Sequence, residues 1–456
     1  MKEERSRSLL SFLFTLRSNP EYISLILNNC KNVEFYQPLS YFVVDSIFTD
    51  CFLEKESYEE ISFIMDKTLE KEINSIPSID NIDMFLSNNS INFFLIKALM
   101  IKNDIQNYMF LILKDLIQEV STYSNLILTL DLQYINNLSL IPESYLSQNS
   151  TDLRRRFYNN YIIHFTKEMI INEKENCKTE KMKKYCDKLL QSIEDTKNEN
   201  LFSNELFLLT VYNGRDPKSV LEIYQIHFML IIHFLERLID KIKSSVNIIP
   251  LCIKYIAKLI SKHLKRKFPD CSYTDINKYI SKFFIEIMIG SVISNPLFHN
   301  ILSHFNFKGN VQINLKLIFQ FLPLMAQEVV FSEESDNNLK CLNIFFFEKM
   351  PDIYYIFDEL VNVELPIYTK NNQSNNELYN KIIVCTPEIL WILCKEINEN
   401  SNLFEELLLK SLNSFMSCMP IEKDYKSYKE GKNKKIYFYK MLKFDIEMKY
   451  ILVNET

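Results

Sequence analysis

The sequence predicts an all-α protein, an irregular assembly of many helices, and two observations carry this prediction. Glycine and proline are scarce, with 4 Gly and 13 Pro in 456 residues. Sheet proteins need many tight turns rich in these residues, whereas long helices joined by short polar segments do not. Apolar residues also recur at spacings of three and four along most of the chain, which is the period of an amphipathic helix.

The segment 249–267 shows this helical pattern most clearly. Its apolar residues form one face of the predicted helix: Ile249, Ile253, Ile256, Ile260 and Leu264. Four lysines form another face: Lys254, Lys258, Lys262 and Lys265. Pro250 falls in the first turn, where a missing N–H costs no hydrogen bond, and Pro269 stands just beyond the last turn.

Similar apolar stripes predict further helices along the chain. Their ranges are 22–27, 39–52, 58–73, 91–101, 107–120, 220–242, 275–289, 315–330, 342–360 and 387–397. Turn-forming or polar runs separate them, most clearly at 76–78, 213–217, 309–310 and 369–376.

Changes in residue composition along the chain predict four segments. Residues 1–136 and 213–419 are the two parts of one helical domain, and 137–212, which is rich in charge runs, is an insertion of charged helices between them. Residues 420–456 form a lysine-rich tail. No repeat of fixed period is present in the sequence, which disfavours a regular solenoid.

The net charge and the cysteine pattern exclude some classes of protein. The net charge of −6 argues against general nucleic-acid binding, which needs a basic surface to displace counterions. The 10 Cys are scattered without a C-x-x-C pair, which is typical of reduced thiols in a cytoplasmic protein. No run of about 18 apolar residues is present, so the sequence predicts no transmembrane segment.

A search for catalytic motifs finds none. With four glycines the chain holds no phosphate-binding loop, and no H-E-x-x-H or G-x-S-x-G motif occurs. The histidine pair at 227 and 233 and the pair at 299 and 304 have spacings that do not bring both rings to one helical face. A lone histidine on an apolar helix, which describes each of these four, is typical of a hydrogen-bonded core residue. The sequence therefore predicts no self-contained enzyme, no cofactor and no metal site.

Several short motifs occur in a fixed order along the chain. The segment 249–258 reads I-P-L-C-I-K-Y-I-A-K and continues to K-F-P-D at 267–270. Before it stand S-N-P-E-Y-I at 18–23, I-F-T at 47–49 and K-T-L-E-K-E-I at 67–73. After it stand T-P-E from 386 and E-I-N from 396. Together these motifs resemble the Ras-GAP-related domain of the IQGAP family.

The resemblance covers about residues 9–419, with 137–212 as an insertion. It implies an all-helical domain with a central groove that receives a small GTPase of the Rho or Ras type. It also implies a role in signalling to the actin cortex or in cytokinesis, with partners among actin-cortex proteins and a location in the cytoplasm, extending to the cell cortex.

The residues that accelerate GTP hydrolysis in active members are missing. The arginine-finger position falls on Lys67 or Thr68, depending on where one residue is gapped, and the second arginine falls on Ile287 or Val292. An arginine finger neutralises charge that develops on the transferred phosphoryl group. The resemblance therefore implies a regulator that binds a GTPase without stimulating hydrolysis. An active GAP that uses another arginine, such as Arg155 or Arg215, and a helical scaffold without GTPase binding remain alternatives.

Basic side chains are the candidates for partner contact. The helix at 249–267 offers a set for an acidic GTPase surface or anionic lipid headgroups, with a merely solvated helix face as the alternative: Lys254, Lys258, Lys262, Lys265 and Arg266. Arg154–Arg156 and the lysines around Gly431 are further basic clusters with the same alternative.

Overall fold

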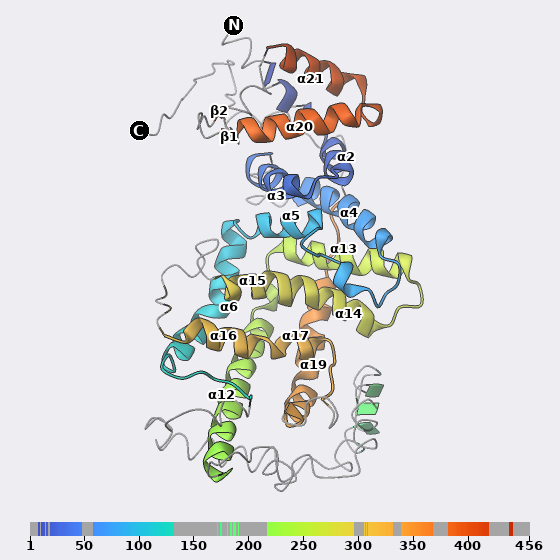
Figure 1. The fold of residues 1–456 in the computed structure, drawn as a ribbon. Coiled ribbons are helices and arrows are strands. Elements are labelled where there is room, and N and C mark those ends of the chain that lie inside the picture. Colours follow the sequence, from blue (N-terminus) through green and yellow to red (C-terminus); the bar gives the residue numbers. More distant parts are fainter. Residues whose placement is uncertain are drawn as a thin grey trace. The chain divides into compact units, whose positions relative to one another are not determined.

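The computed structural model (Figure 1) describes most of the predicted helical domain. The described residues are 19–47, 58–131, 217–295, 309–331, 339–367, 382–418 and 437–440, with isolated positions within 8–16, 171–190 and 305–307. Most of the predicted insertion 137–212 and most of the tail 420–456 lie outside them, so these two segments stay predictions.

The prediction of an all-α fold is confirmed. The described helices group into two compact units, and each unit is built from segments that are distant in the sequence. Unit 1 comprises residues 1–105, 251–270 and 363–456, and unit 2 comprises residues 106–250 and 271–362. Each unit is described by itself below.

Six α-helices in the described part of unit 1 matter for the site. They are α2 (Pro20–Asn29), α3 (Tyr36–Tyr41), α4 (Tyr58–Ser75), α5 (Ile91–Leu99), α13 (Leu251–Lys267) and α20 (Pro387–Glu399). Shorter or peripheral elements are η1 (Val33–Phe35), the π-helical η2 (Phe42–Ile47), η5 (Ile82–Met84), η14 (Ser401–Leu403) and α21 (Glu406–Cys418).

Helix α4 is the centre of unit 1, because it packs against both α2 and α13 (Figure 1). Its buried residues recur with helical spacing and include Ile64, Leu69 and Ile73. Near its end, Glu72 accepts hydrogen bonds from the Leu86 N–H at 2.7 Å and from the Asn92 side chain at 2.6 Å. The carboxylate thereby ties the segment between α4 and α5 back onto α4.

Unit 2 is built around the long helix α12. Its helices are α6 (Asn103–Ser121, apart from its first turn), α12 (Pro217–Ser244), η8 (Val246–Ile248), α14 (Tyr273–Ser281), the π-helix η9 (Lys282–Ile289), α15 (Gly290–Ser294), α16 (Val311–Phe319), α17 (Phe321–Ala326) and α19 (Leu342–Val361). Helix α12 packs against α19 and α16.

Ion pairs join α12 to two neighbouring helices. Towards α6, Glu119 accepts from Arg237 at 2.7 Å and lies 2.8 Å from the His233 ring nitrogen. Towards α19, Lys243 contacts Asp352 at 2.6 Å. Partly exposed pairs of this kind add little stability individually, so the buried apolar residues of α12 supply most of its packing energy.

One short sheet was not predicted. Strand β1 (Ile382–Cys385) pairs antiparallel with β2 (Tyr437–Lys440), so that residue 382 faces 440 and 385 faces 437. Strand β2 belongs to the segment 420–456, which was predicted as a lysine-rich tail. Four residues of this segment therefore pair with β1 in unit 1. In the described part of the chain, no helix is long and apolar enough to cross a membrane.

Candidate functional site

Helices α4 and α13 form the candidate site in unit 1. Helix α13 follows Pro250 and ends at Lys267, two residues before Pro269, within two residues of the predicted range. One face of α13 is buried and includes Ile253, Ile256 and Ile260. The opposite face of α13 carries the cations that the sequence singled out.

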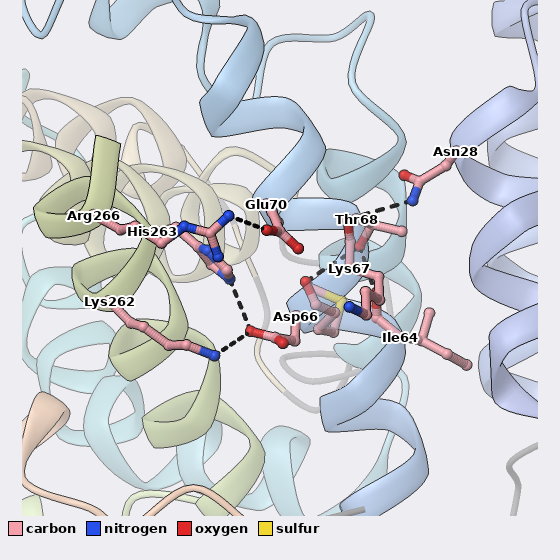
Figure 2. Close-up of polar contacts among 10 residues, drawn as sticks. Asn28, Ile64, Asp66, Lys67, Thr68, Glu70, Lys262, His263 and Arg266 are labelled. Atoms are coloured by element: carbon pink, nitrogen blue, oxygen red, sulfur yellow. Dashed lines mark hydrogen bonds and ion pairs between the residues drawn. The ribbon is translucent and has the colours of Figure 1, made fainter. Parts of the chain in front are cut away.

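A cluster of ion pairs connects the two helices (Figure 2). Asp66 Oδ1 on α4 accepts from Lys262 Nζ at 2.9 Å and lies 2.8 Å from Nε2 of His263. One turn further along both helices, Glu70 Oε1 accepts from Arg266 at 2.6 Å. We call these five residues the α4–α13 ion-pair cluster. Its acids and bases both repeat every four residues, which places them along facing lines of the two helices.

Asp66 is held in its ionised form by this cluster. Burial raises the pKa of Asp66, but hydrogen bonds from His263 and Lys262 and their charges outweigh burial and lower the pKa to about 2. His263 is itself buried, with 3% of its side chain exposed. The pair of Asp66 and His263 therefore fixes the distance between α4 and α13 from inside the unit, whereas the exposed Arg266 adds less.

Lys267 closes the end of α4. Its ammonium group donates to the carbonyl oxygens of Ile73 at 2.9 Å and Asn74 at 2.7 Å, and also to that of Ile76. Carbonyls at a helix C-terminus have no partner within the helix and carry a partial negative charge. A cation from α13 therefore compensates the carbonyl groups at and just beyond the end of α4, of which that of Ile73 also accepts from the Ile76 N–H at 3.1 Å.

Replacing Lys267 with methionine should lower the free energy of unfolding by about 1–2 kcal/mol, because the carbonyls of α4 lose a charged donor. Lys265→Met is the matched control, since Lys265 is exposed on the same turn. Urea denaturation followed by circular dichroism measures both. Equal stabilities of the two variants would contradict the role given to Lys267.

The two candidates for the arginine-finger position differ in exposure. Lys67 is exposed, and its ammonium group lies 5.7 Å from the centroid of the Phe63 ring. Thr68 is buried, with 1% exposed, and its hydroxyl donates to the carbonyls of Ile64 at 3.0 Å and Met65 at 3.4 Å. Of these two side chains, only that of Lys67 reaches the surface of unit 1.

Helix α2 contacts α4 at this same turn. The Asn28 side chain donates to the Lys67 carbonyl at 3.4 Å, and Lys71 donates to the Asn28 carbonyl (Figure 2 shows Asn28 beside Lys67 and Thr68). The backbone at the finger position is thus continuous helix that is held from both sides. The arginine finger of an active GAP must reach a phosphoryl group. In this chain the side chain at that position, Lys67, projects from the regular helix α4.

The two candidates for the second arginine lie in unit 2 and are buried. Ile287 is on the π-helix η9 with 6% exposed, and Val292 is on α15 with 0% exposed. Between them, Gly290 lies against α16, where an added Cβ would be 3.0 Å from the ring of Phe319. Both positions are therefore apolar packing positions in unit 2.

The five cations of α13 that the sequence singled out divide into two sets. Lys262 and Arg266 belong to the α4–α13 ion-pair cluster, whereas three lysines form no ion pair with another residue that the structure describes: Lys254, Lys258 and Lys265. We call these three the α13 lysine row. Lys254 and Lys258 are half-buried and Lys265 is exposed. The sequence grouped all five cations together and did not distinguish the two sets.

Of the other predicted positions, the structure describes only some. Arg154–Arg156, Arg215 and the lysines around Gly431 lie outside the described residues. His227 is a buried core residue, as predicted for a lone histidine on an apolar helix, and its Nδ1 lies 2.8 Å from the Thr129 carbonyl oxygen. The same prediction is wrong for His233, whose side chain is 40% exposed and whose Nε2 lies 2.8 Å from Glu119. Within the described ranges, no three His, Cys, Asp or Glu side chains are grouped so that they would hold a metal ion.

Sequence reasoning missed the pair of the half-buried Asp66 and the buried His263. A signal was present in the sequence, because Asp66 and His263 each interrupt the regular pattern of their helix. Asp66 is an acid on α4, and His263 is a histidine among the lysines of α13. What the sequence lacks is the pairing itself, since the two residues are separated by 197 positions.

The family model described as GTPase-activator protein for Ras-like GTPase matches residues 206–326. This range contains α12, α13, η9 and α15, so the α13 lysine row, Ile287 and Val292 fall inside it. Lys67 and Thr68 fall outside it.

Two curated relatives are both named Ras GTPase-activating-like protein IQGAP2. The protein of Homo sapiens is 21% identical over 174 residues, which is 38% of this chain and 11% of the relative. The protein of Mus musculus is 22% identical over 165 residues, which is 36% of this chain and 10% of the relative. The matched part thus spans about a tenth of the length of these relatives.

Proposed function

Since the chain carries a divergent IQGAP-like Ras-GAP-related domain, we propose that it binds a small GTPase of the Rho or Ras type and does not accelerate GTP hydrolysis. The observation that carries the proposal is the family match over residues 206–326. That range includes much of the helical core of unit 2 and the cationic helix α13 of unit 1.

The side chains at the candidate finger positions support binding without catalysis. A lysine is a point charge and lacks the planar fork with which arginine grips two oxygens. Lys67 stands at one candidate position, and Thr68, at the other, is buried and uncharged at its side chain. Ile287 and Val292 supply no donor that would brace a finger. Each missing group removes stabilisation of the charge that develops in the transition state.

Binding is tested by a pull-down with the whole chain. Purified GTPases of the Rho and Ras types are loaded with GDP or with a non-hydrolysable GTP analogue and are presented separately. We expect at least one GTPase to be retained, with a preference for one nucleotide state. If no GTPase of either type is retained, the proposal fails and the chain is a helical scaffold without GTPase binding.

Single-turnover GTP hydrolysis by the bound GTPase should be unchanged or slowed, because binding restricts the GTPase without supplying an arginine. Lys67→Arg alone should not change this result, since the bracing residue is still missing. Acceleration of about 10²-fold or more by the unmodified chain, the scale of an arginine finger, would refute the proposal. Arg155→Ala and Arg215→Ala would then show which arginine is responsible.

We further propose a role in signalling to the actin cortex or in cytokinesis, with actin-cortex proteins as further partners. Localisation of the tagged chain in dividing cells tests this assignment. A uniform distribution throughout the division cycle would count against it.

A further inference from the structure

We infer that the α13 lysine row (Lys254, Lys258 and Lys265) steers an acidic face of the partner GTPase onto unit 1, and that the neighbouring cations Lys262 and Arg266 do not. The inference rests on the proposed function and adds to it the surface and the charge of the contact.

The position of the row on the helix is the first argument. Its members are separated by four and seven residues, which places them one above another along a single line of α13. Lys262 and Arg266 continue the four-residue spacing of Lys254 and Lys258, and at about 100° per residue they lie about 40° and 80° further round the helix than Lys258, on the side that meets α4. These five cations therefore form one cationic face of α13, whose edge at Lys262 and Arg266 meets α4 and whose remainder is the row.

Charge compensation is the second argument. Asp66 and Glu70 are already engaged by Lys262, His263 and Arg266 (Figure 2). The row has no acid partner in the described ranges, and lysines four residues apart repel one another on a helix. Repulsion of this kind is relieved when an acidic surface approaches. The row is therefore complementary to an anion that another molecule brings.

The partly buried stems are the third argument. Lys254 and Lys258 are half-buried although neither forms an ion pair with a described residue. A partly buried lysine side chain has already lost part of its rotamer freedom, and such lysines commonly pack their methylene chain on the protein while the ammonium group stays in water. Binding then costs less side-chain entropy than it would for a freely moving lysine.

The chemistry of the row favours an acidic protein over an anionic membrane. Clusters that recognise anionic lipids hold about 4–8 Lys or Arg, and the row holds three. Stable membrane attachment also needs an apolar anchor or a second signal. Among the described residues, no exposed large apolar side chain lies on α13. The whole chain carries a net charge of −6, so the row is a local positive site on an acidic protein and not part of a generally basic surface.

The test compares two triple variants of the whole chain with equal loss of charge. The row variant is Lys254→Gln, Lys258→Gln and Lys265→Gln. The control variant removes three exposed lysines elsewhere: Lys31→Gln, Lys316→Gln and Lys410→Gln. Thermal unfolding establishes that both variants are folded, which is expected because the row forms no ion pair within the described structure.

Association and dissociation rates are measured by surface plasmon resonance with the GTPase retained in the pull-down, at low and at physiological ionic strength. For the unmodified chain the association rate should fall as salt rises. The row variant should associate about tenfold more slowly at low salt and lose most of this salt dependence. The control variant should stay within about twofold of the unmodified chain.

The outcomes separate this inference from the proposed function. If a GTPase binds and the row and control variants associate at the same rate, the inference is overturned and the proposed function stands. If no GTPase binds, the proposed function itself is overturned. Vesicles of phosphatidylserine and phosphatidylcholine are a third arm, and sedimentation with them that depends on the row would overturn the assignment to a protein partner.

Discussion

Replacing Ile287 with arginine is expected to lower the free energy of unfolding by about 3–5 kcal/mol, and not to restore a braced finger. The side chain of Ile287 is 6% exposed on η9. Its neighbours Phe283, Phe284 and Met288 on the same helix are also buried. A guanidinium group placed there would leave water without gaining an acid partner, and arginine does not lose its charge at accessible pH.

Two variants control this experiment. Ile287→Met keeps the volume and the apolar character of the side chain and should cost less than about 1.5 kcal/mol. Ile313→Arg introduces the same charge at a position of unit 2 that is 46% exposed, and it should be nearly neutral. Urea unfolding curves give all three values. A loss of less than about 1 kcal/mol for Ile287→Arg would show that this position accommodates an arginine, as in an active GAP.

The same reasoning limits what can be restored by design. The double variant Lys67→Arg with Ile287→Arg supplies both arginines of an active GAP in the sequence, yet the second would be introduced into the core of unit 2. We expect no acceleration of single-turnover GTP hydrolysis by this double variant. Thr68→Arg is a worse choice than Lys67→Arg, since Thr68 is 1% exposed and its hydroxyl bonds within α4.

Helices with a strong period were predictable from the sequence, because their apolar face is the same face that packing buries. Helix α13 was expected at 249–267 and is observed at Leu251–Lys267, and α19 was expected at 342–360 and is observed at Leu342–Val361. Pro351 lies inside α19 without ending it. Tertiary packing of α19 against α12 here outweighs the local preference of proline.

Breaks within continuous apolar runs were not predictable from the apolar period. The range 315–330 was expected as one helix, but the chain forms α16 up to Phe319 and α17 from Phe321 to Ala326. Apolar residues continue through the junction at Gln320, so the apolar period gives no sign of a break. The sign in the sequence is Pro323, which lies in the first turn of α17, where its missing N–H costs no hydrogen bond. The π-helix η9 lies in a range that was expected to be ordinary α-helix. A π-helix differs from an α-helix in its i→i+5 hydrogen bonds, and the apolar composition of the segment does not reveal this difference.

The candidate site was predictable in its residue types but not in its pairings. The cations of α13 and the two finger positions followed from spacing and from motif order. The division of the cations into paired and unpaired sets depends on Asp66 and Glu70, each 196 positions away from its cation. Strands β1 and β2 are also distant in sequence and only four residues long, so neither gave a period that would have indicated a sheet.

The stability of the protein should fall by an amount on the order of 3 kcal/mol as the pH is lowered from about 6.5 to about 4, because His227 must stay neutral in the folded state. Burial lowers the pKa of His227 from 6.5 to about 4, and the hydrogen bond with the Thr129 carbonyl raises it by less. Between these two pH values the unfolded chain binds a proton that the folded chain does not bind. The stability contribution is therefore complete above pH 6.5, declines through this window, and is lost below about pH 4.

His227→Gln is the variant that isolates this effect. Glutamine retains an N–H donor for the Thr129 carbonyl and carries no charge at any pH, so the variant should be somewhat less stable at neutral pH and should lose the decline assigned to position 227. His233→Gln is the matched control, because His233 lies on the same helix α12 but its side chain is 40% exposed. Urea midpoints across the window give the slope for each protein. If His227→Gln declines as steeply as the unmodified chain, the acid sensitivity arises elsewhere and His227 does not need to be neutral for folding.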